Sequence, residues 1–126
     1  MRIEIQKLIS LFNQTFEEGA WHGPTVMETL RGVTAQQAAF RLPDTHSIAE
    51  LTAHMVNWRM YALKKLQGDS DYDVSDEVNF RFDGDWEGTL QELRESQNRL
   101  TTALASVSDS ILQEHVPGAR EEGLTF

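Results

Sequence analysis

The stretch that decides the fold is SIAELTAHMVNWRMYALKKL, residues 47–66. One row of its apolar side chains recurs every three or four residues, which is the repeat of an α-helix with 3.6 residues per turn. The row consists of Ile48, Leu51, Met55, Trp58, Ala62 and Leu66. We predict a helix that ends near Leu66, before Gln67 and Gly68, and that turns this row toward the core.

The start of this helix is marked by a capping box. The hydroxyl of Ser47 can accept a hydrogen bond from the amide of Glu50, whose side chain can reach back to the amide of Ser47. Pro43 breaks the chain shortly before, because a proline cannot continue a helix. The helix is therefore expected to begin directly after Ser47.

Two further long helices flank this one. Residues 3–18 have apolar side chains at helical spacing, and Gly19 provides a C-terminal stop. A second segment begins after Asp85 and runs for about 22 residues at the same repeat. Its apolar row is Trp86, Leu90, Leu93, Leu100 and Leu104, with Gln97 interrupting it. Both segments are predicted to be amphipathic helices that contribute to one core.

The intervening segments are shorter and more irregular. Pro24 is suited to the first position of a short helix that extends to about Arg31. Thr34 and Gln37 resemble a capping box for a brief helical turn. Residues 68–84 are acidic and lack periodicity, so we expect a solvated loop there. No segment has the alternating pattern of a strand, and the fold class is therefore all-α.

Three long helices are one fewer than an up-and-down bundle normally has. The tail that follows them does not provide a fourth, since Pro117, Gly118 and Gly123 interrupt it. We expect either that the final helix lies beyond the end of this chain, or that a second copy of the protein covers the open side. The second possibility predicts a homodimer.

Length and charge exclude several classes of protein. A chain of 126 residues fits a single domain, residues 1–126. Twenty acidic against eleven basic side chains give a net charge of −9, which argues against nucleic-acid binding. No apolar run approaches the roughly 20 residues that cross a bilayer, so no membrane partner is expected. The N-terminus lacks the pattern of a signal peptide and cysteine is absent, which together predict a cytoplasmic protein without disulfides.

Three motifs carry a resemblance to a known family. They are HSIAELTAHMVNW at residues 46–58, WEGTLQELRESQNRL at residues 86–100 and VPG at residues 116–118. Together they resemble the DinB-like (DinB/YfiT) superfamily of bacterial four-helix bundles, over residues 21–126. The resemblance implies a divalent metal, nickel or zinc, held by three histidines, the first of which matches His54. The other two form a His-x-x-x-His pair on the last helix, and this sequence contains no such pair.

The resemblance also implies a range of functions. The family includes thiol-dependent S-transferases and isomerases, and metal-dependent hydrolases. A metal-dependent transferase or hydrolase acting on a small molecule or a thiol substrate is one expectation. The alternative is a non-catalytic bundle that acts through homodimerisation or association with another protein. The incomplete histidine set leaves open whether this chain is an enzyme.

Each candidate site residue has two interpretations. The spacing of His54, which borders the apolar row of its helix, favours a histidine at the edge of the core with one hydrogen-bond partner, whereas the resemblance favours a metal ligand. Glu50 could orient the ring of His54, as metal-bound histidines require, or it could serve only the capping box. His22, His46 and His115 are predicted to lie outside the site.

Overall fold

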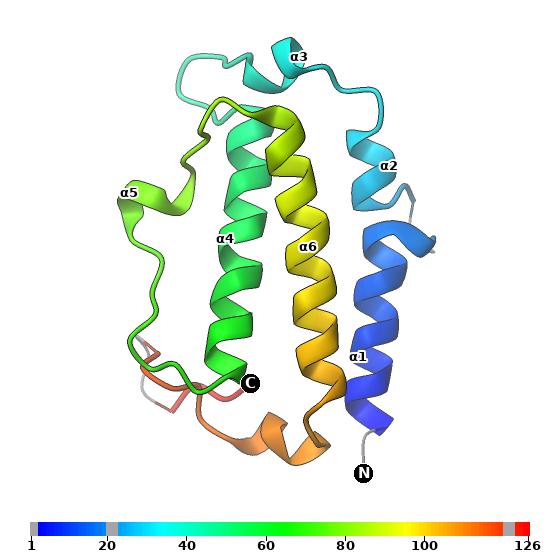
Figure 1. Ribbon diagram of the computed structural model, residues 1–126, viewed down its shortest axis with the longest axis vertical. Coiled ribbons are helices and arrows are strands. Elements are labelled where there is room, and N and C mark those ends of the chain that lie inside the picture. Colours follow the sequence, from blue (N-terminus) through cyan, green and yellow to red (C-terminus); the bar gives the residue numbers. More distant parts are fainter. Residues whose placement is uncertain (1–2, 20–22, 120–122) are drawn as a thin grey trace.

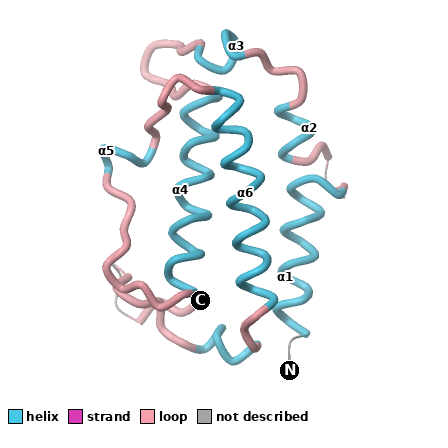
Figure 2. Tube along the Cα trace, in the orientation of Figure 1, coloured by secondary structure: helices cyan, strands magenta, loops and turns pink. Residues whose placement is uncertain are grey.

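The computed structural model describes residues 3–19, 23–119 and 123–126, and three long helices form its body. They are α1 (Ile3–Asn13), α4 (Ile48–Leu66) and α6 (Trp86–Ala105), with α6 lying between the other two in Figure 1. Both α1 and α4 pack against α6, but within the described residues no close backbone contact joins α1 to α4. The prediction of an all-α bundle is confirmed, and Figure 2 shows only helices and loops.

Short helical elements lie between the long helices and after the last of them. They are the π-helical turn η1 (Gln14–Glu18), α2 (Val26–Leu30), α3 (Ala35–Ala39), α5 (Asp76–Asn79) and the 3-10 helix η2 (Asp109–Gln113). The helix predicted to begin at Pro24 begins two residues later, because the Thr25 hydroxyl accepts a hydrogen bond from the Glu28 amide at 3.1 Å. The loop predicted over residues 68–84 contains α5, which lies beside α4 in Figure 1.

Helix α4 has the predicted bounds but not the predicted orientation. Its capping box is present, with the Glu50 amide 3.0 Å from the Ser47 hydroxyl. The buried residues of α4 are Ala49, Thr52, Ala53, Val56, Leu63 and Lys65. The predicted core-facing row instead leaves Ile48, Leu51 and Trp58 exposed by 39%, 47% and 36%. The predicted orientation is wrong for these three, because α6 packs against the neighbouring side of α4. We call the surface formed by Ile48, Leu51, Met55 and Trp58 the open face.

The core runs along the length of α6 as three clusters. The buried members are Ile5, Leu63, Leu100 and Leu104 in the first, Phe16, Met27, Val56 and Leu93 in the second, and Ala38, Ala49 and Trp86 in the third. Every cluster contains at least one of the apolar residues predicted along α6. In the third, the Trp86 indole also donates a hydrogen bond to the Val33 carbonyl at 3.0 Å. That bond ties the start of α6 to the α2–α3 connection.

The start of α1 is capped from the other end of the sequence. The carboxylate of Asp109 accepts hydrogen bonds from the amides of Glu4 and Ile5, each at 3.1 Å. The first amides of a helix have no partner within the helix, and a negative charge there is stabilising. Asp109 therefore holds α1 and η2 together.

The loop that follows α4 is held in place by contacts of the Ser70 carbonyl group with Lys65 and Gly118. The buried ammonium of Lys65 donates to the carbonyls of Asp69 and Ser70 at 3.0 and 3.3 Å. Gly118 packs closely against the same Ser70 carbonyl and has a φ of +64°. An added Cβ at Gly118 would lie 1.9 Å from the Ser70 oxygen. Only glycine fits this position, which gives the VPG motif a structural role.

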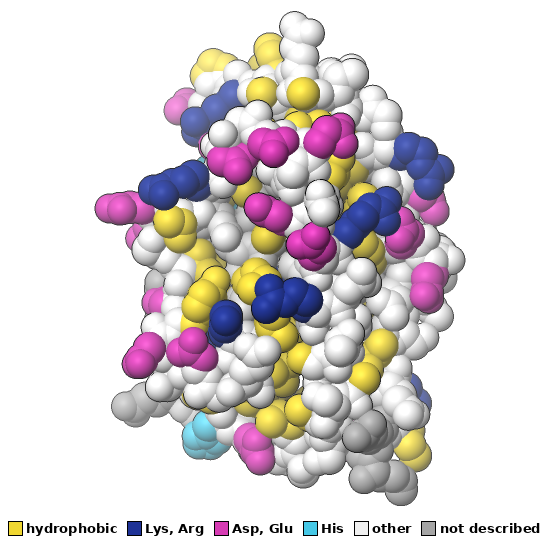
Figure 3. Space-filling view, in the orientation of Figure 1, with side chains coloured by type: hydrophobic (Ala, Val, Ile, Leu, Met, Phe, Trp, Pro, Cys, Tyr) yellow, Lys and Arg dark blue, Asp and Glu magenta, His cyan; other side chains and the backbone are white. Residues whose placement is uncertain are grey.

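The surface reflects the acidic composition. Figure 3 shows acidic side chains gathered over the upper part of one face, with basic side chains interspersed. Burial raises the pKa of Glu92, and the nearby carboxylates of Asp83 and Glu95 raise it further. Of the helices that the structure describes, none has the length and apolarity required to cross a bilayer.

Candidate ligand site at the open side of the bundle

His54 lies half-buried on α4, between the open face and the segment that contains α5. Its Nδ1 is 2.7 Å from the side-chain oxygen of Asn79. The indole Nε1 of Trp58 donates to the same oxygen at 2.8 Å. One amide oxygen therefore joins two rings that stand one helical turn apart.

This shared oxygen determines which ring nitrogen of His54 carries the proton. An indole N–H can only donate, so its partner on Asn79 must be the amide oxygen, which can only accept. His54 must then donate from Nδ1, and the lone pair of the neutral ring lies on Nε2. Nε2 is consequently the nitrogen available to a metal ion or to a hydrogen-bond donor.

Helix α5 is held against α4 by stacking and by hydrogen bonds. The Phe80 ring lies between two histidine rings, with centroid distances of 3.9 Å to His46 and 4.3 Å to His54 and interplanar angles of 5° and 2°. The Asn57 amide donates to the carbonyls of Val78 and Asn79 at 2.8 and 2.9 Å. These contacts position the Asn79 oxygen before any ligand binds.

Glu50 serves the capping box. Its carboxylate accepts a hydrogen bond from the Ser47 amide at 2.9 Å, and this bond is the main cause that lowers the pKa of Glu50. Arg41 and His46 also lie within 3.7 Å of the carboxylate. No hydrogen bond joins Glu50 to His54 in the part of the chain that the structure describes. The residue that orients the His54 ring is therefore Asn79 and not Glu50.

Asn79 was not identified as a site residue from the sequence. It lies 25 residues after His54, within a stretch that was expected to be a solvated loop. The available signal was the pair Val78 and Phe80, two apolar residues on either side of Asn79 in an otherwise acidic segment. Such a pair indicates that the segment packs against the bundle.

The two other histidines that the structure describes are not brought to His54 as ligands. His46 reaches Glu50 and stacks on Phe80, whereas His115 forms an isolated antiparallel bridge with Thr125. His22 lies outside the described residues. Over residues 3–19, 23–119 and 123–126, no group of three or more His, Asp or Glu side chains could hold a metal ion. The chemistry of His54 fits a metal ligand, but the number of described ligands does not fit a metal site.

An apolar groove adjoins the open face. It has a volume of about 370 Å³, and its lining includes Thr15 of η1, Val26 and Leu30 of α2, and Leu51, Thr52 and Met55 of α4. In a four-helix bundle this is the type of position where helices enclose a ligand. The groove therefore joins the uncovered side of α4 to the N-terminal part of the chain.

Arg59 lies one helical turn beyond the groove and is partly buried. Its Nε donates to the side-chain oxygen of Gln97 at 3.0 Å, and its guanidinium is 5.4 Å from the centre of the Phe16 ring. Gln97 in turn donates to the side-chain oxygen of Asn13 at 3.3 Å. This chain of contacts runs from α4 through α6 to α1. It explains why a buried glutamine interrupts the apolar row of α6.

Among the described residues, no carboxylate forms an ion pair with Arg59. Burial lowers the pKa of its guanidinium, which nevertheless stays protonated, as arginine does in proteins. Ion pairs within 4.0 Å join other arginines of the described chain to carboxylates, but none involves Arg59. Its described hydrogen-bond acceptors, the Gln97 amide and the Met55 carbonyl, are uncharged.

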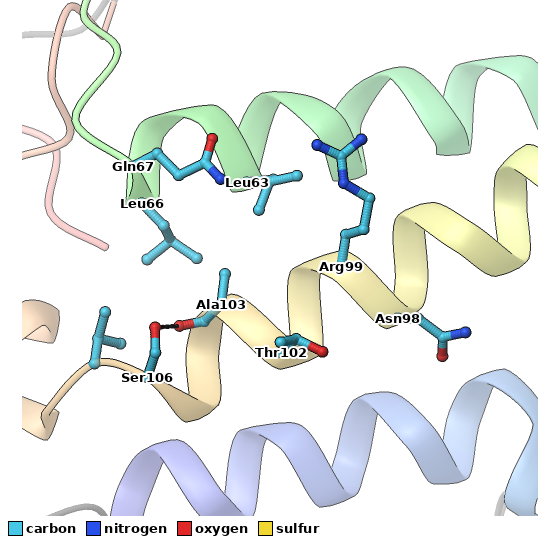
Figure 4. A pocket seen from close by; sticks show the side chains of 9 residues that line it. Leu63, Leu66, Gln67, Asn98, Arg99, Thr102, Ala103 and Ser106 are labelled. Carbon is cyan, nitrogen blue, oxygen red and sulfur yellow. Dashed lines mark hydrogen bonds between the residues drawn. The ribbon is translucent and has the colours of Figure 1, made fainter.

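A second groove lies between α4 and α6, toward their C-terminal ends. Figure 4 shows side chains from both helices around it, among them Leu63, Leu66, Gln67 and Arg99. Its volume is about 460 Å³. Its lining contains one cation, Arg99, and neither a histidine nor a carboxylate. It therefore lacks the paired groups that acid–base chemistry requires.

Comparison with known proteins gives one match. The sequence model of the DinB superfamily matches residues 20–126. No curated protein and no solved structure matched the chain. The matched range includes α4, α6 and the segment that carries Asn79.

Proposed function

This chain belongs to the DinB superfamily, and on that premise we propose that it is a ligand-binding bundle in which His54 supplies one nitrogen to a divalent metal ion, nickel or zinc. The hydrogen bond from His54 Nδ1 to Asn79 carries this proposal. It fixes the ring and leaves the Nε2 lone pair available, which is how metal-bound histidines are usually held.

Among the described residues His54 is the single candidate ligand, so the proposal requires ligands in addition to it. A single imidazole does not hold a divalent ion against water, because protein sites for such ions use three or four ligands. A bound ion would supply Lewis-acid chemistry, polarising a carbonyl group or activating a water molecule or thiol. Transfer or hydrolysis on a small molecule or thiol substrate is the class of activity that fits such a centre.

Metal loading followed by elemental analysis tests the role of His54. After incubation with excess nickel or zinc and desalting, the wild-type protein is expected to retain one ion per chain. His54→Ala should abolish retention, and Asn79→Ala should weaken it by about 10- to 100-fold, because the ring loses its orienting partner. His46→Ala is the matched control, since it removes a ring stacked on the same Phe80.

A second measurement examines the ring without metal. Nitrogen-15 NMR of the metal-free protein is expected to show His54 with its proton on Nδ1, and Asn79→Ala should produce a mixture of tautomers. Absence of metal after loading, or unchanged retention in His54→Ala, would refute the metal proposal. The tautomer result would stand independently of that outcome.

A second candidate function is association through the open face, as a homodimer. Ile48, Leu51 and Trp58 are exposed apolar side chains at helical spacing on α4, with the partly buried Met55 between the last two. On α1, Leu11 and Phe12 are exposed by 52% and 43%. Large contiguous apolar patches on a protein surface mark sites of association, and a second copy is the partner that symmetry most readily provides.

Sedimentation at micromolar concentration tests the homodimer. The wild-type protein is expected to sediment as a dimer, and Leu51→Asp should shift it to monomer, because a charge would be buried in the interface. Phe40→Asp is the control, since Phe40 is 68% exposed but does not belong to the open face. A wild-type protein that is monomeric throughout would eliminate this candidate.

A further inference from the structure

We propose that Arg59 binds the carboxylate of an amphiphilic small molecule whose apolar part lies in the groove lined by Leu51, Thr52 and Met55. This inference concerns a second binding element on α4 and does not depend on a metal ion at His54. It assigns a class of ligand, a monoanionic carboxylate with an apolar body, to the open side of the bundle.

The first argument is the unpaired charge. Removing a guanidinium from water without a counter-ion is costly, so such groups are normally paired with a carboxylate or another anion. The chain has 20 acidic side chains, yet no described ion pair places one of them within 4.0 Å of Arg59. Gln97 and Met55 supply only neutral oxygen atoms. The planar guanidinium can also bind both oxygens of a carboxylate at once.

The second argument is the place of this charge relative to the groove. Long side chains on a helix lean toward its N-terminus, so the Arg59 side chain lies over the preceding turn. The Met55 carbonyl in that turn is 3.5 Å from a terminal nitrogen of Arg59, and Met55 also lines the groove. On the opposite wall, the Phe16 ring contacts Arg59 and the neighbouring Thr15 lines the groove. Arg59 itself does not line the groove, but its guanidinium contacts Met55, which does, and Phe16, the chain neighbour of Thr15.

The third argument is the volume of the groove and the net charge of the ligand that would fit it. A volume of about 370 Å³ lies in the range of pockets for small ligands, which runs from about 300 to 1,000 Å³. The six lining residues named above include no charged side chain, and Arg59 beside them supplies a single positive charge. A carboxylate carries a single negative charge, whereas a phosphate monoester carries about 1.5 to 2 at neutral pH. The carboxylate is therefore the closer match.

Calorimetric titration of the metal-free protein with octanoate tests this assignment. Three comparison ligands are titrated in the same way. Octanol has the same chain length but no charge, and acetate has the charge but no long chain. Octyl phosphate has the chain but carries a phosphate in place of the carboxylate. Octanoate is expected to bind at least tenfold more tightly than each of the three. Arg59→Gln should weaken octanoate binding at least tenfold and leave octanol binding unchanged. Arg99→Gln is the control, because it removes an arginine of the other groove.

A direct readout keeps the test valid if Arg59→Gln fails to fold. In the wild-type protein, the NMR signal of the Arg59 side-chain Nε–H should shift on addition of octanoate and stay fixed with octanol. Equal binding of octanoate and octanol, or an Arg59 signal that does not move, would overturn the proposal. A dimer that neither binds octanoate nor dissociates in its presence would also overturn it, since a second copy would then occupy the face. Loss of metal binding at His54 would affect none of these outcomes.

Discussion

Replacing Trp86 with alanine is expected to lower the free energy of unfolding by about 3–5 kcal/mol, the range for large core aromatics. Trp86 is only 2% exposed and packs in the cluster that contains Ala38 and Ala49. The substitution leaves a cavity between α6 and the start of α4, and it removes the donor for the Val33 carbonyl. A domain of this size has a total stability of about 5–15 kcal/mol, so the variant approaches the unfolding threshold.

Chemical denaturation monitored by circular dichroism measures this effect, with Trp58→Ala as the matched control. Trp58 is 36% exposed, and its indole shares the Asn79 oxygen with His54. We expect Trp58→Ala to cost about 1 kcal/mol, because water already reaches this ring. Equal losses in the two variants would contradict the assignment of Trp86 to the core and Trp58 to the open face.

Gly118→Ala is expected to destabilise the protein by about 2–3 kcal/mol. The new Cβ would lie 1.9 Å from the Ser70 carbonyl oxygen, a contact that only backbone movement can relieve. Its φ of +64° adds the strain of a left-handed conformation for alanine. Movement of either segment would also disturb the hydrogen bonds that Lys65 donates to Asp69 and Ser70.

Thermal denaturation and limited proteolysis together measure the effect at Gly118. The variant should melt at a lower temperature and be cleaved sooner in the segments around Ser70 and Gly118, which the substitution forces apart. Gly68→Ala provides the comparison, because Gly68 has a φ of +85° but nothing within 4 Å of an added Cβ. Gly68→Ala should lower the free energy of unfolding by only about 1 kcal/mol, because backbone strain is its single cost. If the two variants are equally stable, the close contact with Ser70 has no energetic role.

Local signals in the sequence predicted most of the helices. The capping box of Ser47 and Glu50 marked the start of α4 because both partners lie within four residues. The orientation of α4 could not be predicted in the same way. Its spacing reveals an apolar side, but the buried side is set by where α6 packs, which depends on contacts distant in the sequence. Leu51 and Trp58 are therefore apolar, regularly spaced and exposed.

The candidate site was only partly predictable for the same reason. His54 was identified because a histidine at the edge of an apolar row is unusual, whereas Gln97 was noted only as an interruption of the apolar row of α6. Their partners, Asn79 and Arg59, are 25 and 38 residues away. An asparagine in an acidic loop and an arginine on a helix are ordinary surface residues in a single sequence. Only the packing of α5 and α6 against α4 shows that they face polar groups.

The cap that Asp109 places on α1 also constrains the order of assembly. Its two hydrogen bonds join residues that are separated by 105 and 104 positions in the sequence. Among the described elements, α1 packs against the adjoining η1 and against α6 and η2. Loop-closure entropy favours the nearer pairing of α4 with α6 first. During synthesis α1 leaves the ribosome well before its packing partners exist. We therefore expect α1 to dock after α4 and α6 have paired, so that Ile5 is buried only at that later step.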